Sequence, residues 1–263
     1  MSLRSLAKGF LTDDQRRSVR RAINSVTWLY EKPLALYRAR DFDRRLPYIP
    51  NGRRWRSDIP FDLHFSIQQG VIEYTYRDVP TLKHPMEMAL YTLLIWKLKP
   101  RTIVEIGSKA GGSAQWMADL MKIYGIDGKI ISIDIAPPKP PYVRPEIAFL
   151  HGDANKLGDC LSRDFLASIA HPLLVIEDSS HHSDATLAVL RFFDPVMQPG
   201  EYFIVEDGAV SDMGDDSHRG GGPGHAISQF LLETKGRYQI DASYCDRYGH
   251  NVTGNPNGYL RRV

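Results

Sequence analysis

The chain has 263 residues, of which 43% are hydrophobic and 24% charged, and its formal net charge is +2. That length and composition fit one globular α/β domain with an extension and leave room for a sizeable core. No apolar run is long enough to span a bilayer, no signal peptide opens the chain, and two cysteines give no disulfide framework, so we expect a protein of the reducing cytoplasm.

The first 60 residues are basic, with 14 Lys and Arg against 6 Asp and Glu. Residues 12–15 form an N-cap pattern and predict a basic amphipathic helix, which carries Val19, Ile23, Val26, Trp28 and Leu29. Such an arm can meet anionic lipid, nucleic acid or the acidic body of a partner subunit, or it can be only a solvated face. Four prolines between residues 33 and 60 then predict that residues 40–80 are irregular.

These features divide the chain into two parts. Residues 1–80 form a basic, helical or irregular extension, which could be a lid, a dimer arm or a peripheral contact with a membrane. Residues 81–263 form the second domain. A homo-oligomer is expected, and nucleic acid is not an expected partner, since no stretch combines aromatic and basic residues for stacking on bases.

From residue 85 onward, strand patterns alternate with helix patterns. The predicted helices lie at 85–98, 112–124, 156–169, 184–197 and 225–234, and the predicted strands at 101–107, 129–135, 147–150, 172–177, 202–205, 238–244 and 258–263. A polar, glycine-rich loop spans 208–224. Repeated βα units indicate a Rossmann-like α/β fold, with a mostly parallel sheet and helices on both faces. Ligands of such sheets lie beyond the carboxyl ends of the strands.

The turn after the first predicted strand is the strongest local signal. Its pattern is E-x-G-x-x-x-G, from Glu105 through Gly107 to Gly111, followed by Gly112 and Ser113. Glycines let a ligand approach the backbone, and the N-terminus of the next helix offers free N–H groups. The turn resembles the cofactor loop of methyltransferases that use S-adenosylmethionine (SAM). We therefore assign cofactor binding to Glu105, Gly107, Ser108, Gly111 and Ser113, although an ordinary glycine-rich turn remains the alternative.

Two further acids follow predicted strands and are candidates for the cofactor site. Asp134 ends the second strand, where it can accept hydrogen bonds from ribose hydroxyls or cap a turn. Asp153 follows the third strand and can reach the adenine amine or cap the next helix.

The fourth and fifth predicted strands end in carboxylates, at Asp178 and at Glu206 with Asp207. If these strands are neighbours, the three acids crowd together, and they repel one another unless a cation joins them. Oxygen ligands without a thiolate favour Mg²⁺, then Mn²⁺ or Ca²⁺. Helix caps or ion pairs with Arg191 or Arg219 are the alternative.

Two histidines, His181 and His182, follow Asp178 by three and four positions. A histidine just past a metal-ligating acid is a candidate general base. We choose His181 for this role and expect His182 to face the helix side.

Together these residues resemble the SAM-dependent O-methyltransferases grouped as the cephalosporin hydroxylase family, which includes rhamnosyl and macrolide-sugar O-methyltransferases. The matching segments cover about residues 80–263: Val104–Gly107, Gly111–Ala114, Asp178–His181, Val205–Asp207, Gly222–Gly224 and Asn255–Arg261. The resemblance implies that Asp178, Glu206 and Asp207 hold Mg²⁺ and that His181 is the base, with Asp178 also catalytic. It also implies that residues 81–263 are a SAM-dependent methyltransferase domain.

The expected activity is therefore SAM- and Mg²⁺-dependent methylation of a small-molecule hydroxyl, with a rhamnosyl-type or natural-product glycoside as the expected acceptor. A catechol would also suit a chelating ion. The rival hypotheses are a nicotinamide-dependent enzyme, which the missing G-x-G-x-x-G argues against, a SAM-binding or membrane-tethered partner protein without turnover, and a nucleic-acid methyltransferase.

Overall fold

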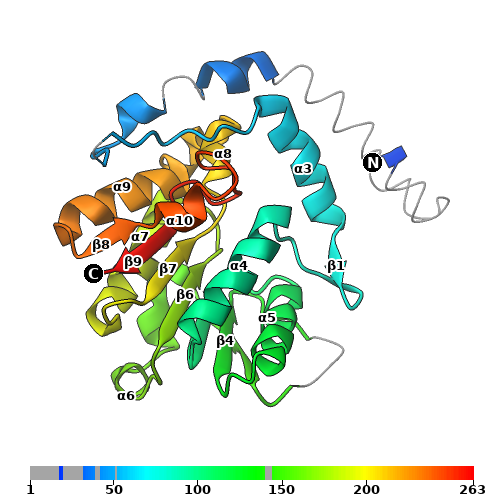
Figure 1. Cartoon of the computed structure of the whole chain (residues 1–263), viewed down its shortest axis with the longest axis vertical. Coiled ribbons are helices and arrows are strands. Elements are labelled where there is room, and N and C mark those ends of the chain that lie inside the picture. The colour runs from blue at the N-terminus through cyan, green and yellow to red at the C-terminus, as the bar shows by residue number, and fades with distance from the viewer. Residues whose placement is uncertain (1–17, 20–31, 39–41, 51, 140–143) are drawn as a thin grey trace.

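The structure is a computed structural model that describes residues 18–19, 32–38, 42–50, 52–139 and 144–263 (Figure 1). The basic helix predicted after Thr12 lies almost wholly outside these residues. Among the described residues, none of the helices combines the length and the apolarity needed to cross a bilayer.

A seven-stranded sheet forms the centre of the molecule, in the order β5-β4-β3-β6-β7-β9-β8. Its strands are β3 (Thr102–Ile106), β4 (Lys129–Asp134), β5 (Ile147–His151), β6 (Leu173–Glu177), β7 (Tyr202–Val205), β8 (Tyr238–Ile240) and β9 (Tyr259–Arg262). The first five are parallel, while β9 pairs antiparallel with both β7 and β8. The predicted Rossmann-like, mostly parallel sheet is confirmed.

The order of the sheet reverses at β3, because β4 lies on one side of it and β6 on the other. This reversal is the switch point at which parallel α/β sheets bind ligands. β6 and β7 are neighbours, with Glu177 paired to Val205. The acids that follow these two residues therefore leave the sheet side by side.

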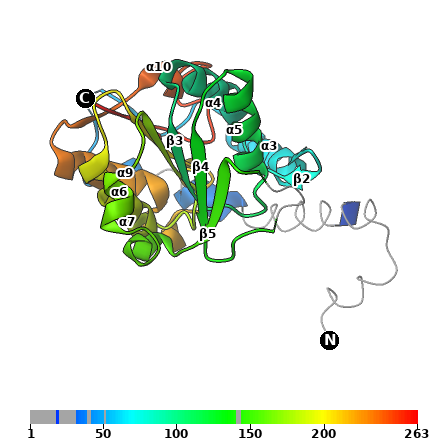
Figure 2. The same cartoon turned by 90° about the horizontal axis from the view of Figure 1, so that it is seen from below.

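Helices cover both faces of the sheet (Figure 2). On one face, α4 (Pro85–Leu98) and α5 (Gly112–Ile123) pack on alternate strand residues such as Ile103 and Ile176. On the other face, α7 (Ser183–Phe193) and α9 (Gly222–Thr234) pack on the intervening residues, such as Val104 and Val175. Both faces of the inner strands are thus buried, which explains why most residues of these strands are apolar.

Helix α4 matches its predicted bounds because its ends carry clear signals. Pro85 stands in its first turn, where the missing N–H costs nothing. Lys99 ends the helix in a left-handed conformation, and Pro100 then prevents its continuation.

The prediction that residues 40–80 are irregular is wrong for α3 (Phe61–Glu73), which is a regular helix. Pro60 does not break the chain here, because it stands at the N-cap, where proline is compatible with a helix. Only His64 and Val71 of this helix are buried, so it lacks the apolar stripe by which a helix is recognised. A short hairpin of β1 (Thr75–Tyr76) and β2 (Val79–Pro80) follows it.

Three other segments also differ from prediction. The helix expected at 156–169 is instead the 3₁₀ segment η2 (Ala154–Asp159) and the short α6 (Arg163–Ala167), because the hydroxyl of Ser162 caps a new helix start. The loop 208–224 contains α8 (Ala209–Asp212) and η4 (Ser217–Arg219), and α9 already begins at Gly222. The strand expected at 238–244 ends at Ile240, because Asp241 caps α10 (Ala242–Cys245). The remaining short helices are η1 (Asp43–Arg45) and η3 (Asp194–Val196).

Residues before α3 are bonded to the loop that precedes β9. Arg53 forms a bidentate pair with Asp246, at 2.8 and 2.9 Å. The side-chain amides of Asn251 and Asn257 donate to the carbonyls of Arg54 and Trp55. The segment between α10 and β9 thus clamps residues 53–55 of the N-terminal extension through Asp246, Asn251 and Asn257.

Candidate functional site

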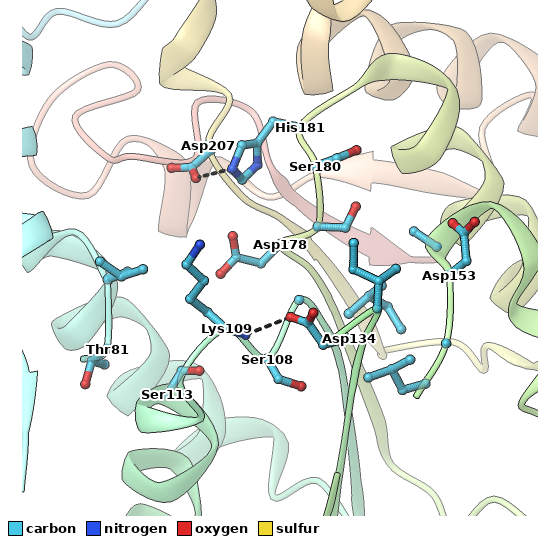
Figure 3. A pocket seen from close by; sticks show the side chains of 18 of the residues that line it. Thr81, Ser108, Lys109, Ser113, Asp134, Asp153, Asp178, Ser180, His181 and Asp207 are labelled. Carbon is cyan, nitrogen blue, oxygen red and sulfur yellow. Dashed lines mark hydrogen bonds and ion pairs between the residues drawn. The ribbon is translucent and has the colours of Figure 1, made fainter. Parts of the chain in front are cut away.

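A cavity of about 610 Å³ opens at the carboxyl ends of β3, β4 and β6, at the switch point of the sheet (Figure 3). Its size falls within the range of about 300–1,000 Å³ that is usual for ligand and cofactor pockets. Five of the predicted cofactor residues line it: Gly107, Ser108, Ser113, Asp134 and Asp153. Two others, Glu105 and Gly111, lie behind its wall.

Glu105 is fully buried and accepts hydrogen bonds from the hydroxyls of Ser113, at 2.5 Å, and Ser132, at 2.6 Å. It therefore ties the start of α5 to β3 and β4. Gly111 has a left-handed φ of +82°, and an added Cβ would lie 2.9 Å from the ring of Phe149. Both residues shape the glycine turn, and their contact with a cofactor stays a prediction.

Asp134 and Asp153 show how the loops around the cavity are held. Asp134 accepts the backbone N–H groups of Lys109 and Ala136, each at 2.8 Å, which fixes its carboxylate at the cavity wall (Figure 3). Each oxygen retains a lone pair that can accept from a ribose hydroxyl. Asp153 caps η2 by accepting from Asn155, as the alternative prediction stated. Its contact with adenine remains a prediction.

The acids after β6 and β7 meet at the edge of this cavity. Asp178, His181 and Asp207 each offer one ligand atom, and these atoms all lie within 4.8 Å of one another. The Nε2 atom of His181 is 3.2 Å from Oδ2 of Asp207 (Figure 3). His181 and Asp207 both adopt left-handed backbone conformations, with φ of +58° and +55°. Such conformations are costly for residues other than glycine and are concentrated at functional sites.

The side chain of Glu177 holds the turn that carries Asp178 and His181. The buried carboxylate of Glu177 accepts the hydroxyls of Ser179 and Thr186, and so joins the end of β6 to α7. His182 is exposed and stands at the N-cap of α7. Which side its ring faces stays a prediction.

Glu206 lies outside the group of three ligand atoms, because other residues hold its carboxylate. The ammonium of Lys83 is 2.6 Å from Oε1 of Glu206 and 2.6 Å from Oδ2 of Asp178. The hydroxyl of Tyr91 also donates to Oε1 of Glu206. Lys83 and Tyr91 were not predicted, and no local pattern identifies them, since Lys83 precedes Asp178 by 95 positions in sequence.

Burial and charge perturb this cluster strongly. Burial, with the nearby charge of Asp207, raises the pKa of Asp178 to about 7, although Lys83 opposes that shift. Burial and the charge of Asp178 likewise raise the pKa of Glu206. Burial alone would lower the pKa of Lys83, but the two carboxylates raise it well above its usual value. Lys83 alone therefore does not offset the burial and mutual repulsion of these acids.

The donor set suits a hard divalent ion. Lys83 and Tyr91 both contact Oε1 of Glu206, Lys83 contacts Oδ2 of Asp178, and His181 contacts Oδ2 of Asp207. Within the described part of the chain, the second oxygen of each carboxylate therefore accepts no hydrogen bond. Three such oxygens beside excess negative charge match the ligands that Mg²⁺ and Mn²⁺ take in proteins.

Asn255 positions Asp207 and is a further residue that sequence reasoning did not assign to the site. Its side-chain oxygen accepts the backbone N–H of Asp207 at 3.1 Å, and the residue is 1% exposed. The left-handed turn at Asp207 therefore depends on the loop that precedes β9.

If Asp207 ligates an ion as predicted, Asn255→Ala is expected to lower kcat by about 10–100-fold, which is the usual effect of losing a group that orients a metal ligand. Affinity for SAM should stay within about twofold, because Asn255 is not in the wall of the cofactor cavity. Asn255→Asp keeps an acceptor oxygen and should retain more activity than the alanine variant. Steady-state kinetics combined with calorimetric titration of SAM would measure both effects, and full activity of the alanine variant would contradict the role.

A nucleotide-sized cavity at the switch point, next to the acids of β6 and β7, is the arrangement expected of a SAM-dependent O-methyltransferase. Comparison with known proteins places the chain more narrowly. The sequence pattern of the family described as Rhamnosyl O-methyltransferase/CmcI matches residues 68–263, so the chain belongs to this family. The resemblance inferred from the motifs is confirmed.

Relatives and solved structures agree with this assignment. The rhamnosyl O-methyltransferase of Mycobacterium leprae is 28% identical over 192 residues, which cover 72% of this chain and 82% of that protein. The Mycobacterium tuberculosis protein of the same name is 26% identical, with 72% and 78% covered. A CmcI structure described with Mg and SAM is 29% identical, has a TM-score of 0.58, and is matched over 82% of this chain and 90% of that one. A CmcI structure with SAH is 30% identical, with a TM-score of 0.57 and 82% and 98% covered.

Proposed function

We propose that this protein transfers the methyl group of SAM to a hydroxyl of a sugar, of the rhamnosyl or natural-product glycoside type, with the help of a divalent ion. The observation that carries the proposal is the convergence of Asp178, His181 and Asp207 within 4.8 Å at the edge of the cofactor cavity. The names of the curated relatives, all rhamnosyl O-methyltransferases, support the choice of a sugar acceptor.

The carboxylates of Asp178, Glu206 and Asp207 would hold the ion. Mg²⁺ is the preferred ion, and Mn²⁺ is the second choice. When bound, the ion supplies a Lewis acid that lowers the pKa of the acceptor hydroxyl. Lys83 keeps Asp178 and Glu206 in place by one oxygen each, so that the other oxygens stay available. Asp134 orients the ribose of SAM, and the glycine turn at Gly107 lets the cofactor approach the backbone.

His181 is the general base in this proposal. Asp207 contacts its Nε2 and orients the ring, while its Nδ1 has no hydrogen-bond partner among the described residues. The acceptor oxygen loses its proton to His181 and attacks the methyl carbon as the bond from that carbon to sulfur breaks, which leaves SAH. Most of the rate enhancement would come from positioning and charge stabilisation.

The test is transfer of a labelled methyl group from SAM to rhamnosides, other glycosides and catechols. Wild-type enzyme should methylate a glycoside, and chelation should lower the rate by about 100-fold or more, reversibly on addition of Mg²⁺. Titration of Mn²⁺, followed by electron paramagnetic resonance, should detect one site that Asp207→Asn weakens.

Other outcomes of these experiments would contradict the proposal or favour one of its alternatives. Full activity after chelation would contradict the ion. Methylation of catechols alone would favour the catechol alternative. SAM binding without transfer to any acceptor would favour a binding protein.

A further inference from the structure

A second cavity, of about 260 Å³, adjoins the cofactor cavity on the far side of His181 and Asp207. The two cavities share Gln68, His181 and Asp207 in their walls. Its other walls come from α3, the residue before α4, α8, the segment from Met213 to η4, and Gly254 in the loop before β9. They include His64, His84, Ala209, Val210 and Met213. Figure 1 shows α3 and α8 at the same end of the molecule.

The histidines in these walls have unsatisfied polar atoms. His64 is 3% exposed, and its Nε2 has no hydrogen-bond partner among the described residues. The same holds for Nε2 of His84, a side chain 10% exposed, and for Nδ1 of His181. Buried polar atoms in native proteins are nearly always hydrogen-bonded, so three around one cavity call for a ligand that is rich in donors and acceptors.

From this arrangement we infer that the second cavity binds the acceptor sugar and that His64 and His84 hydrogen-bond its hydroxyls; the inference rests on the proposed function. A hydroxyl both donates and accepts, which matches a neutral imidazole. The apolar side chains of Ala209, Val210 and Met213 offer a surface for the C–H face of a sugar ring. The volume fits one ring-sized group and lies just below the usual range of about 300–1,000 Å³.

The state of His64 supports a neutral acceptor. Burial, together with electrostatic interactions with His84 and Arg56, lowers the pKa of His64 to about 4. Its ring is therefore uncharged near pH 7. An uncharged imidazole suits an alcohol better than a carboxylate or a phosphate, which would favour a cation.

The inference also gives part of the N-terminal extension a role. His64 and Gln68 lie on α3, within residues 1–80, and face the reaction site from outside the sheet. The clamp between Arg53 and the loop before β9 holds the chain that leads into α3. Acceptor choice would thus depend on the extension, whereas the cofactor site belongs to the sheet.

Two substitutions test the cavity from different walls. His64→Phe keeps the ring and removes the nitrogens, and it should raise KM for the acceptor by ~10-fold or more. His64→Gln restores an amide that can donate and accept, and it should recover most of that loss. Met213→Trp fills the cavity from α8's side and should also raise KM. Ser66→Ala, on the exposed face of α3, is the matched control and should leave KM unchanged.

Two readouts separate acceptor binding from a structural role. Calorimetric affinity for SAH should change by less than about twofold in every variant, and the thermal midpoint should report folding. Binding of methyl α-rhamnoside to the complex with SAH and Mg²⁺, followed by saturation-transfer NMR, should be lost in His64→Phe and kept in Ser66→Ala.

Unchanged KM in both His64→Phe and Met213→Trp would overturn this inference while leaving the proposed function intact. Loss of SAH affinity in these variants, with KM for the acceptor unchanged, would also overturn it. If wild-type enzyme neither binds nor methylates any glycoside, the proposed function fails first, and the assignment of the cavity fails with it.

Discussion

Asp178→Asn is expected to abolish methyl transfer, with a loss in kcat of about 1,000-fold or more, while SAM still binds. The substitution keeps the shape of the side chain and removes one of the negative charges that the ion would need. The amide oxygen can still accept from the ammonium of Lys83, which also retains Glu206, so the fold should survive. Single-turnover transfer of labelled methyl, with calorimetric titration of SAM, measures the two effects separately.

Asp127→Asn is the control for this experiment, because Asp127 is a fully exposed carboxylate whose partner, Arg101, lies 3.8 Å away. Its kinetics should match those of the wild type. The role of Asp178 would be refuted if its variant kept both its turnover and its affinity for Mn²⁺. A parallel loss of SAM affinity would instead show that Asp178 belongs to the cofactor site alone.

The sheet was predictable because its strands carry strong local signals. β3, β6 and β7 are short apolar runs that end in an acid or a glycine, and each lies where it was expected. α3 was not predicted, because it buries only His64 and Val71 and so shows no apolar period. Short helices such as α6 and α10 depend on single capping residues, which are weak signals within a polar stretch.

The acids of the site were predictable, but their partners were not. Asp178 and Asp207 follow adjacent parallel strands, so topology alone brings them together. The arrangement around Glu206 depends on Lys83 and Tyr91, which reach it from the other end of the domain sequence. Asn255 holds Asp207 across 48 positions. Contacts between residues so far apart in the sequence follow no fixed spacing, so a sequence pattern cannot predict them.

Distant contacts also explain why position 107 is a glycine. The sequence predicts that glycine is needed there so that the cofactor can approach the backbone. The structure adds a second reason. An added Cβ at Gly107 would lie 1.8 Å from the backbone oxygen of Asp178, and the residue has a φ of +107°. Its neighbours are fixed, because the N–H of Gly107 donates to Ile133 and that of Asp178 donates to Ile106. The end of β3 therefore cannot move away without breaking the sheet.

Gly107→Ala is accordingly expected to destabilise the protein by about 4 kcal/mol or more, or to prevent folding, since backbone must yield to backbone. In a chain of this size, such a loss lowers the thermal midpoint by about 10 °C or more. Gly200→Ala is the matched control: its φ is +93°, and no heavy atom lies within 4 Å of the added Cβ. It should cost only the strain of the left-handed conformation, about 1–2 kcal/mol. Thermal unfolding followed by circular dichroism compares the two, and an equal loss in both variants would show that contact with Asp178 is not what requires glycine at position 107.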